Sequence, residues 1–414
     1  MTTANRLATV ALVLVGASVI LAHFGIGPRL VIPMYGVIVI AYVLQKMLFA
    51  ELYQQRYQRR AAAAPDVSAR TCDVAIAFYN EDPKLLIRSV ESCIAQRGIT
   101  LGKIIVVDDG SVSSDTANAV EAHFSGNPHV MVIRCPENRG KRHALATAIE
   151  HASAEFTALL DSDTLLEPDA LQRLIEVFAD DVAVVTGNVR ALNRGTNWLT
   201  RLIDARFRNA FLIERAAHSY FGSVLCASGV LSAYRTGFLK KSASTWSSQT
   251  FLGQPVQFGD DRRLTGMALA TGRAIVATKA IAHTDVPTTL RKFLKQQVRW
   301  NKSFIRESLI FVKDFGALHP AGFFSFVEVF FWLFYLSTIA NVLFVNRHVG
   351  AWSLGFIWLG YVIATGLFRN IGIIWREPKL ALLVPLYSLL HVLVLTPLRL
   401  YSLATILDTR WGTR

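Results

Sequence analysis

Long apolar stretches at both ends of the chain constrain this sequence more than any other feature. Residues 7–28 and 30–45 contain no Asp, Glu, Lys or Arg, and apolar runs return at 321–345 and 352–373. A helix of about 20 apolar residues spans a bilayer. We therefore expect an N-terminal helical hairpin and a C-terminal group of helices in a membrane. A cleaved signal peptide is the alternative interpretation of the first run.

A last apolar stretch, residues 380–403, is interrupted by Pro385, Pro397 and Arg399. Prolines break helices, so a broken or interfacial element is the alternative to a full span here. With four spanning helices, both ends of the chain are expected in the cytosol. The arginines that follow the N-terminal hairpin favour the same orientation, because Lys and Arg gather on the cytoplasmic side of spanning helices.

The composition fits a membrane protein with a folded middle. Charged residues make up only 18% of the 414 residues, whereas an average soluble domain has about 25%. The net charge of +13 favours anionic membrane lipids as a partner, and no nucleic acid is expected. The four cysteines lack CxxC spacing, which argues against a zinc site or a disulfide framework and suits a reducing cytosol.

Short apolar runs alternate with helical patterns in the middle of the chain. The runs Val74–Phe78, Ile104–Val107 and Phe156–Leu160 are separated by segments of helical spacing, which predicts a mostly parallel sheet. Ligands of such sheets bind beyond the carboxyl ends of the strands. The expected layout is a transmembrane hairpin (1–52), a cytosolic linker (53–70), an α/β domain (71–287), basic amphipathic interfacial helices (288–320), transmembrane or interfacial helices (321–403) and a C-terminal segment (404–414).

Five short motifs offer chemistry, and each alone also fits an ordinary turn, helix start or interfacial anchor. The segments 107–111 (VDDGS) and 161–163 (DSD) follow strands, and the second is typical of a site for a hard cation such as Mg²⁺ or Mn²⁺. The segment 259–262 (GDDR) offers a carboxylate as general base. The segment 296–300 (QQVRW) pairs a phosphate-binding arginine with a flat ring for a sugar. Residues 138–142 (NRGKR) suit an anion at a helix start but are not a Walker A sequence.

The order of the motifs DDGS, DSD, GDDR and QxxRW, followed by membrane helices, resembles the membrane-bound family 2 glycosyltransferases. The segments 249–253 (QTFLG), 296–304 (QQVRWNKSF) and 411–414 (WGTR) are similar to the streptococcal-type (class I) hyaluronan synthases. This second resemblance covers nearly the whole chain. The rhizobial chitooligosaccharide synthases are similar but less so, because they typically have Glu where this chain has Asp260 and lack the Asn-Lys-Ser-Phe run.

The resemblance implies a GT-A α/β domain with a mostly parallel sheet, on the cytosolic face of a multi-pass protein of the plasma membrane with α-helical transmembrane segments. It implies a processive synthase that uses UDP-GlcNAc and UDP-GlcA with Mg²⁺ or Mn²⁺ and moves the growing polysaccharide across the membrane. A single-donor β-glycan synthase, such as an N-acetylglucosaminyltransferase that makes chitin oligosaccharides, is the alternative.

The resemblance also implies roles for single residues. Asp261 matches the general base and Asp163 the metal ligand. Acceptor binding falls to Trp300, which would lie under the sugar, and to Cys226 and Asp260. Donor UDP binding falls to Tyr79, Asp109, Lys141, Asp161, Arg299, Trp411 and Arg414, the last two within a C-terminal gating segment.

Overall fold

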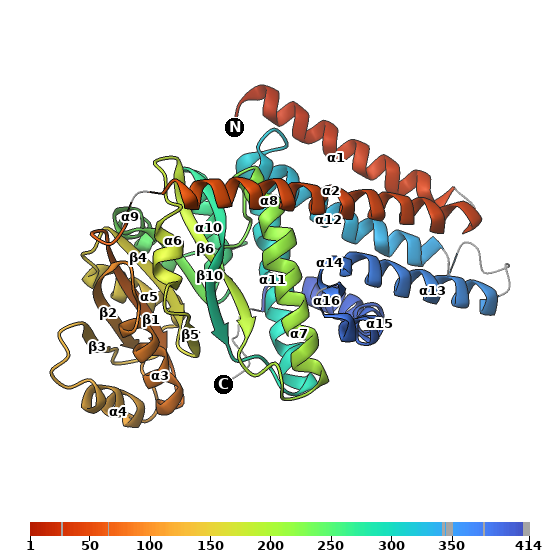
Figure 1. Cartoon of the computed structure of the whole chain (residues 1–414). Helices are drawn as coiled ribbons and strands as arrows, with labels where there is room; N and C mark the ends of the chain where they lie inside the picture. Colours follow the sequence, from red (N-terminus) through yellow and green to blue (C-terminus); the bar gives the residue numbers. More distant parts are fainter. Residues whose placement is uncertain (26–27, 65, 342–343, 345–350, 376, 409–414) are drawn as a thin grey trace. The chain divides into compact units, whose positions relative to one another are not determined.

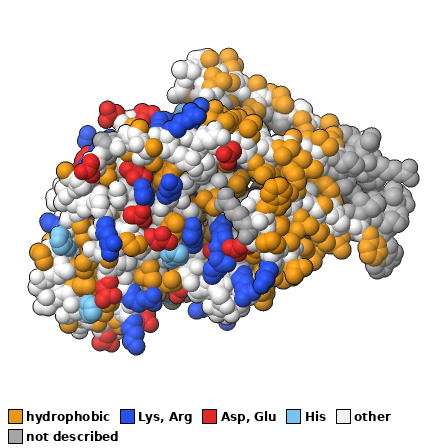
Figure 2. All heavy atoms as spheres, in the orientation of Figure 1, with side chains coloured by type: hydrophobic (Ala, Val, Ile, Leu, Met, Phe, Trp, Pro, Cys, Tyr) orange, Lys and Arg blue, Asp and Glu red, His pale blue; other side chains and the backbone are white. Residues whose placement is uncertain are grey.

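The computed structural model describes residues 1–25, 28–64, 66–341, 344, 351–375 and 377–408. The chain forms two compact units. One comprises Phe49–Arg299 together with Ile406–Arg414, and the other comprises Met1–Leu48 together with Trp300–Thr405. Figure 2 shows charged side chains gathered over the α/β unit, whereas hydrophobic side chains cover the described surface of the helical unit on this face.

An eight-stranded sheet with the order β3-β2-β1-β4-β7-β6-β10-β5 forms the centre of the α/β unit (Figure 1). Four neighbouring pairs are parallel: β1 with β2, β1 with β4, β2 with β3, and β6 with β10. The short β7 is antiparallel to both of its neighbours, and β5 is antiparallel to β10. The strands are β1 (Thr71–Phe78), β2 (Thr100–Asp108), β3 (Val130–Arg134), β4 (Phe156–Asp161), β5 (Thr164–Leu166), β6 (Val182–Ala191), β7 (Leu231–Arg235) and β10 (Arg273–Thr284).

The helices of this unit cover the sheet and supply its core. Strand β1 is buried at every position except its first residue, as expected of a central strand that is covered on both faces. Helix α5 packs against β1 and β2, and α9 packs beside α5. The helices are α3 (Pro83–Ile94), α4 (Asp115–His123), α5 (Lys141–His151), α6 (Ala170–Ile175), α7 (Trp198–Asn209), the π-helix η1 (Ala210–Arg215), α8 (Ala216–Tyr220), α9 (Thr236–Ser247) and α10 (Asp260–Leu269).

The expected α/β elements are confirmed along the first half of this unit. The three apolar runs correspond to β1, β2 and β4, and the segments of helical spacing between them contain α3, α4 and α5. A mostly parallel sheet is therefore correct as a fold class, with antiparallel strands added at β7 and β5. The apolar runs predict strands well because a strand buried on both faces needs apolar side chains at successive positions.

The helical unit contains α1 (Thr3–Phe24) and the first part of α2 (Pro28–Ala62). Helix α2 continues through residues 53–62, so the first half of the expected linker is helical. In that part, which belongs to the α/β unit, the hydroxyl of buried Tyr53 donates to the Val276 carbonyl oxygen at 2.6 Å. Helix α11 (Leu290–Phe315) runs from one unit into the other.

The C-terminal part of the helical unit is α12 (Pro320–Ala340), α13 (Ala351–Arg369), α14 (Ile371–Ile374) and a chain of short helices from residue 378 to 404. These short helices are the 3-10 helix η3 (Pro378–Leu382), α15 (Val384–Leu390), the π-helix η4 (His391–Leu395) and α16 (Thr396–Ala404). Pro385 and Pro397 each lie in the first turn of a helix. The interruptions expected from the prolines are therefore present.

Among the described residues, four helical segments are long and apolar enough to cross a membrane: Thr3–Ala22, Met34–Ala62, Pro320–Ala340 and Pro378–Ala404. The described part of α13 adds a shorter apolar helix, Leu359–Arg369. By length and composition, residues 378–404 could thus cross a membrane, although the stretch is divided into several short helices. In α1, apolar side chains such as Leu7, Leu14 and Leu21 are exposed in the isolated chain, as lipid-facing side chains would be.

Candidate active site

Three neighbouring parallel strands end together, and candidate residues follow each of them. In the register of the sheet, Phe78 of β1 pairs with Asp108 of β2, and Ala77 pairs with Asp161 of β4. Tyr79, Asp109 and Asp161 therefore lie at one edge of the sheet. This is the edge at which open α/β sheets bind their ligands.

Asp109 anchors the loop that leads into α5. Its carboxylate accepts hydrogen bonds from the backbone N–H of Arg139 at 3.1 Å and of Gly140 at 2.9 Å, and its own N–H donates to the Phe78 carbonyl at 2.9 Å. Burial raises the pKa of Asp109 despite these two donors. A carboxylate has about four acceptor positions, so capacity remains for a donor such as a base N–H.

Gly110 makes this close approach of two loops sterically feasible. Its φ is +68°, and a Cβ there would lie 2.3 Å from the Glu137 carbonyl carbon. Only glycine fits both conditions. The Asp-Gly of the DDGS motif is therefore required by the packing of this loop against residues 137–140.

Lys141 bridges two carboxylates from distant parts of the chain. Its Nζ contacts Asp161 of the DSD motif and lies 3.7 Å from Oδ2 of Asp260 in the GDDR motif. Burial alone would lower the pKa of Lys141, but the charges of Asp161 and Asp260 outweigh it and raise the pKa. The lysine is thus firmly cationic, and it joins the donor-site motif to the motif of the candidate base.

The adjacent carboxylates Asp260 and Asp261 have opposite environments. Burial opposes ionisation of Asp260, but the charges of Lys141 and Arg142 outweigh it and lower its pKa. Burial, reinforced by the charge of Asp260, raises the pKa of Asp261. Two carboxyl groups whose pKa values are pushed apart commonly take different roles in proton transfer. Asp261 is the one suited to accept a proton.

Cys226 donates its thiol hydrogen to Oδ2 of Asp261 at an S···O distance of 3.3 Å. Burial and the neighbouring Asp261 raise the pKa of Cys226 to about 12, so the thiol stays protonated and is a donor. The loop that follows Cys226 is tied to α10, because the Ala227 N–H donates to Oγ1 of Thr265 at 2.8 Å. The cysteine predicted near the acceptor therefore contacts the predicted base.

Gly229 shows how tightly these groups converge. A methyl group at this position would lie 3.3 Å from Nζ of Lys141, 3.6 Å from Oδ1 of Asp161 and 3.9 Å from Cβ of Asp261. The backbone of the 226–229 loop thus lies directly over the three side chains. No sequence signal identified this glycine before the fold was known.

The DSD motif is embedded in its own hydrogen-bond network. Oδ1 of Asp163 accepts from Oγ1 of Thr284 in β10 at 3.0 Å, and the hydroxyl of Ser162 donates to Glu81 at 2.7 Å. Burial, followed by the charge of Asp161, raises the pKa of Asp163 to about 7. The raised pKa means that nearby positive charge does not offset the burial of Asp163 and the charge of Asp161. The carboxylate oxygens of these two side chains suit a hard divalent cation.

Within the described part of the chain, no group of three or more His, Cys, Asp or Glu residues is arranged to hold a metal ion. The two carboxylates of the DSD motif fit such an ion only if other oxygens complete its coordination. A nucleotide diphosphate and water are the natural sources of these oxygens.

The remaining predicted residues differ in how far the structure connects them to this cluster. Arg299 is the last residue of the α/β segment, and its charge helps to lower the pKa of Asp260. Tyr79 is half-buried directly after β1. Trp300 opens the segment that belongs to the helical unit and is 47% exposed. Trp411 and Arg414 lie outside the described residues.

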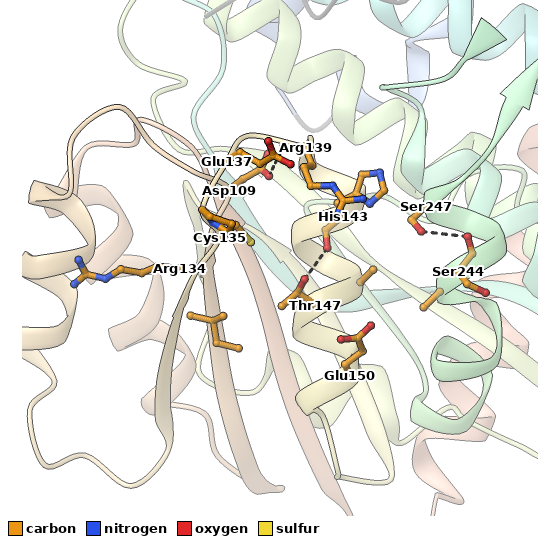
Figure 3. Close-up of a pocket in the computed structure, with 14 residues that line it drawn as sticks. Asp109, Arg134, Cys135, Glu137, Arg139, His143, Thr147, Glu150, Ser244 and Ser247 are labelled. Carbon is orange, nitrogen blue, oxygen red and sulfur yellow. Dashed lines mark hydrogen bonds between the residues drawn. The ribbon is translucent and has the colours of Figure 1, made fainter.

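A pocket of about 470 Å³, lined in part by Asp109, lies between the segment after β3 and the helices α5 and α9. Figure 3 shows Asp109, Arg139 and His143 at one end of it, with Ser244 and Ser247 on the facing helix. The residues that line this pocket do not include Asp161, Asp163 or Asp261. Of the residues predicted at the donor site, Asp109 lines this pocket.

Comparison with known proteins agrees with this geometry. Residues 73–242 match the model of the glycosyl transferase family 2. Over 390 residues, the chain is 40% identical to a hyaluronan synthase of Streptococcus pyogenes, covering 92% of this chain and 90% of the relative. The chain belongs to the class I hyaluronan synthases.

The chain is also similar to two other glycosyltransferases. An N-acetylglucosaminyltransferase of Mesorhizobium japonicum is 32% identical over 351 residues, covering 83% of this chain and 81% of that protein. A mannosyltransferase of Pyrobaculum calidifontis, solved with GDP-Man and Mn²⁺, aligns with a TM-score of 0.58 at 20% identity and covers 91% of this chain and 99% of that one. The first relative is more distant than the streptococcal synthase, and the second shows the GT-A fold.

Proposed function

We propose that this chain polymerises hyaluronan from UDP-GlcNAc and UDP-GlcA and moves the growing polysaccharide across the plasma membrane. The observation that carries the proposal is the cluster in which Lys141 joins the DSD motif to Asp260, beside an Asp261 of raised pKa. The cluster occurs in a chain that is 40% identical to a streptococcal hyaluronan synthase over nearly its whole length.

The donor binds at the carboxyl ends of β1, β2 and β4. Asp109 and Tyr79 hold the uridine part, and Lys141 and Arg299 face the diphosphate as fixed cations. Asp109 supports this role because its carboxylate is held by the N–H groups of Arg139 and Gly140 and keeps acceptor capacity. Trp411 and Arg414 close over the bound donor as part of the C-terminal segment.

Asp163, with Asp161 beside it, would hold a divalent ion, Mg²⁺ or Mn²⁺, together with oxygens of the donor diphosphate. When bound, such an ion stabilises the negative charge that develops on the leaving UDP. The residues of the chain act on the same charge. Arg299 and Lys141 are preorganised cations in a partly buried site, where electrostatic stabilisation is stronger than in water.

Asp261 removes the proton from the acceptor hydroxyl. Its raised pKa makes it a better base than an ordinary carboxylate, and the proton ends on one of its two carboxylate oxygens. Asp260 stays ionised beside Lys141 and, with Cys226, orients the acceptor. The hydroxyl attacks opposite the departing UDP, so an α-linked donor gives a β-linked product.

Trp300 supports the sugar at the end of the acceptor chain and keeps it in register between additions, which is an orientation effect. The four apolar helical segments anchor the enzyme among membrane lipids as a multi-pass protein. The α/β unit faces the cytosol, where nucleotide sugars are available. The polymer then leaves between the helices.

The alternative function is a single-donor β-glycan synthase, such as an N-acetylglucosaminyltransferase, because those enzymes share 32% identity with this chain. Incubating the purified protein with each donor alone and with both separates the two functions. We expect high-molecular-weight polymer only when both donors are present. Polymer formed from UDP-GlcNAc alone at the full rate would establish the alternative.

A further inference from the structure

Arg142 has a buried side chain that the mechanism above does not use. It follows Lys141 in the first turn of α5 and is only 2% exposed. Its Nη1 donates to Oε1 of Gln249 at 2.7 Å and to the Trp246 carbonyl at 3.4 Å, and its Nη2 donates to the Phe258 carbonyl at 3.3 Å. All three acceptors belong to the stretch from the end of α9 to the start of α10.

That stretch is irregular and ends at the candidate base. It contains only a small hairpin, β8 (Thr250–Phe251) and β9 (Gln254–Pro255), before Gly259 turns into α10 with a φ of +81°. So short a hairpin is not stable alone. Contacts from outside the stretch must therefore fix the position at which α10 begins.

Arg142 provides such contacts from α5, and Trp246, in the last turn of α9, adds one within the stretch. Arg142 contacts the beginning of the stretch through Gln249 and the end of the stretch through Phe258. The indole N–H of Trp246, which is 1% exposed, donates to the Asp260 carbonyl at 2.9 Å. The backbone of the GDDR motif is thus tied to α9 through Trp246, and the residue before the motif, Phe258, is tied through Arg142 to α5, the helix that also carries Lys141.

A buried guanidinium is costly unless hydrogen bonds replace its water. Arginine suits this place because its planar fork reaches several acceptors in fixed directions, whereas a lysine is a single flexible point charge. The charge of Arg142 also lowers the pKa of Asp260, after that of Lys141. The side chain therefore acts on the active site both by geometry and by charge.

We propose that Arg142 is a positioning residue of the synthase: through Gln249 and Phe258 it holds the 246–260 stretch so that Asp261 meets the acceptor beside Lys141. This inference rests on the proposed function, because it takes Asp261 as the base. Arg142 itself touches neither donor nor acceptor. Its loss is therefore expected to slow the chemical step and to leave donor binding largely intact.

The test compares R142K, Q249L and Q249E with the wild type and with R97K, a lysine substitution at an exposed arginine away from the site. We expect R142K and Q249L to lower kcat by about 10- to 100-fold, as displacement of a reacting group by about 1 Å can do. The KM for each donor should change less than about 3-fold on the same reasoning. Q249E keeps the acceptor oxygen and should restore most of kcat.

Combination with D261N separates this inference from the proposed function. If Arg142 acts through Asp261, R142K or Q249L adds little to the loss already caused by D261N. Losses that multiply, an unchanged kcat, or an equal rise in donor KM would each overturn the positioning role. A D261N variant of full activity would instead overturn the base assignment. If R142K fails to fold, Q249L and Q249E, which alter a neutral side chain, still decide the question.

Discussion

Replacement of Asp261 by Asn is the sharpest perturbation of the proposed mechanism. Asn keeps the size of the side chain and one oxygen, which can accept from either Cys226 or the Arg262 N–H, but it cannot take a proton at neutral pH. We expect kcat for polymer synthesis to fall by about 10²–10⁴-fold, the usual contribution of a general base. This fall corresponds to a rise of about 3–5 kcal/mol in the activation free energy.

Stability should hardly change in Asp261→Asn. A negative charge in the first turn of a helix contributes only about 0.3–1 kcal/mol. Here the raised pKa means that folding disfavours the ionised form, so loss of the charge removes a penalty together with the helix contribution. The fall in rate is therefore expected with only a small change in Tm.

The pH profile supplies an independent readout. Asp261 serves as base only when ionised, and its pKa lies above the ordinary value. The kcat of the wild type should therefore fall as the pH drops through that raised pKa, and Asp261→Asn should lose this acid limb. Asp180→Asn, at an exposed carboxylate, is the matched control and should leave both rate and profile unchanged.

The assay measures initial UDP release and polymer yield with both donors at saturation, and UDP affinity by direct binding. The reasoning is refuted if Asp261→Asn keeps more than about a tenth of the wild-type kcat, because a general base contributes at least about 10²-fold. It is equally refuted if UDP binding falls as much as kcat, since a base acts on the acceptor.

Four further changes test other parts of the site. Gly229→Ala should keep the fold but lower kcat/KM by about 10-fold or more, because its methyl group would enter the space between Lys141 and Asp161. Trp300→Ala should abolish elongation while UDP binding survives, and equal loss of both would indicate a structural role. Cys226→Ala removes a hydrogen bond that lowers the pKa of Asp261. The pKa of Asp261 should therefore rise, and the acid limb of the pH profile of kcat should move to higher pH. Asp163→Asn should raise the metal concentration needed for half-maximal activity, and an unchanged metal titration would exclude it as a ligand.

The sequence predicted the strand-end residues well because their signals are local. An apolar run followed directly by Asp109 or Asp161 marks the end of a buried strand, and parallel neighbours bring such ends together. The class of fold follows from the same alternation of strands and helices. The antiparallel β7 between β4 and β6 could not be predicted, because no local pattern encodes which distant strands pair.

The interior of the site was less accessible to sequence reasoning. Lys141 was expected at the nucleotide, and the ion pairs that its Nζ makes with Asp161 and Asp260 were not foreseen. The opposite pKa shifts of Asp260 and Asp261 depend on burial and on charges from other elements. The bond between Arg142 and Gln249 joins residues 107 positions apart. Such contacts exist only once the fold has brought distant segments together.

The proposed function requires one active site to alternate two donors. The most direct measurement reconstitutes the protein in lipid vesicles with UDP-GlcNAc and UDP-GlcA carrying different labels and follows the incorporation of both into polymer. We predict equal molar incorporation of the two sugars, abolished when either donor is omitted and reduced in parallel for both sugars by Asp261→Asn. Sustained incorporation of one sugar without the other would contradict the account.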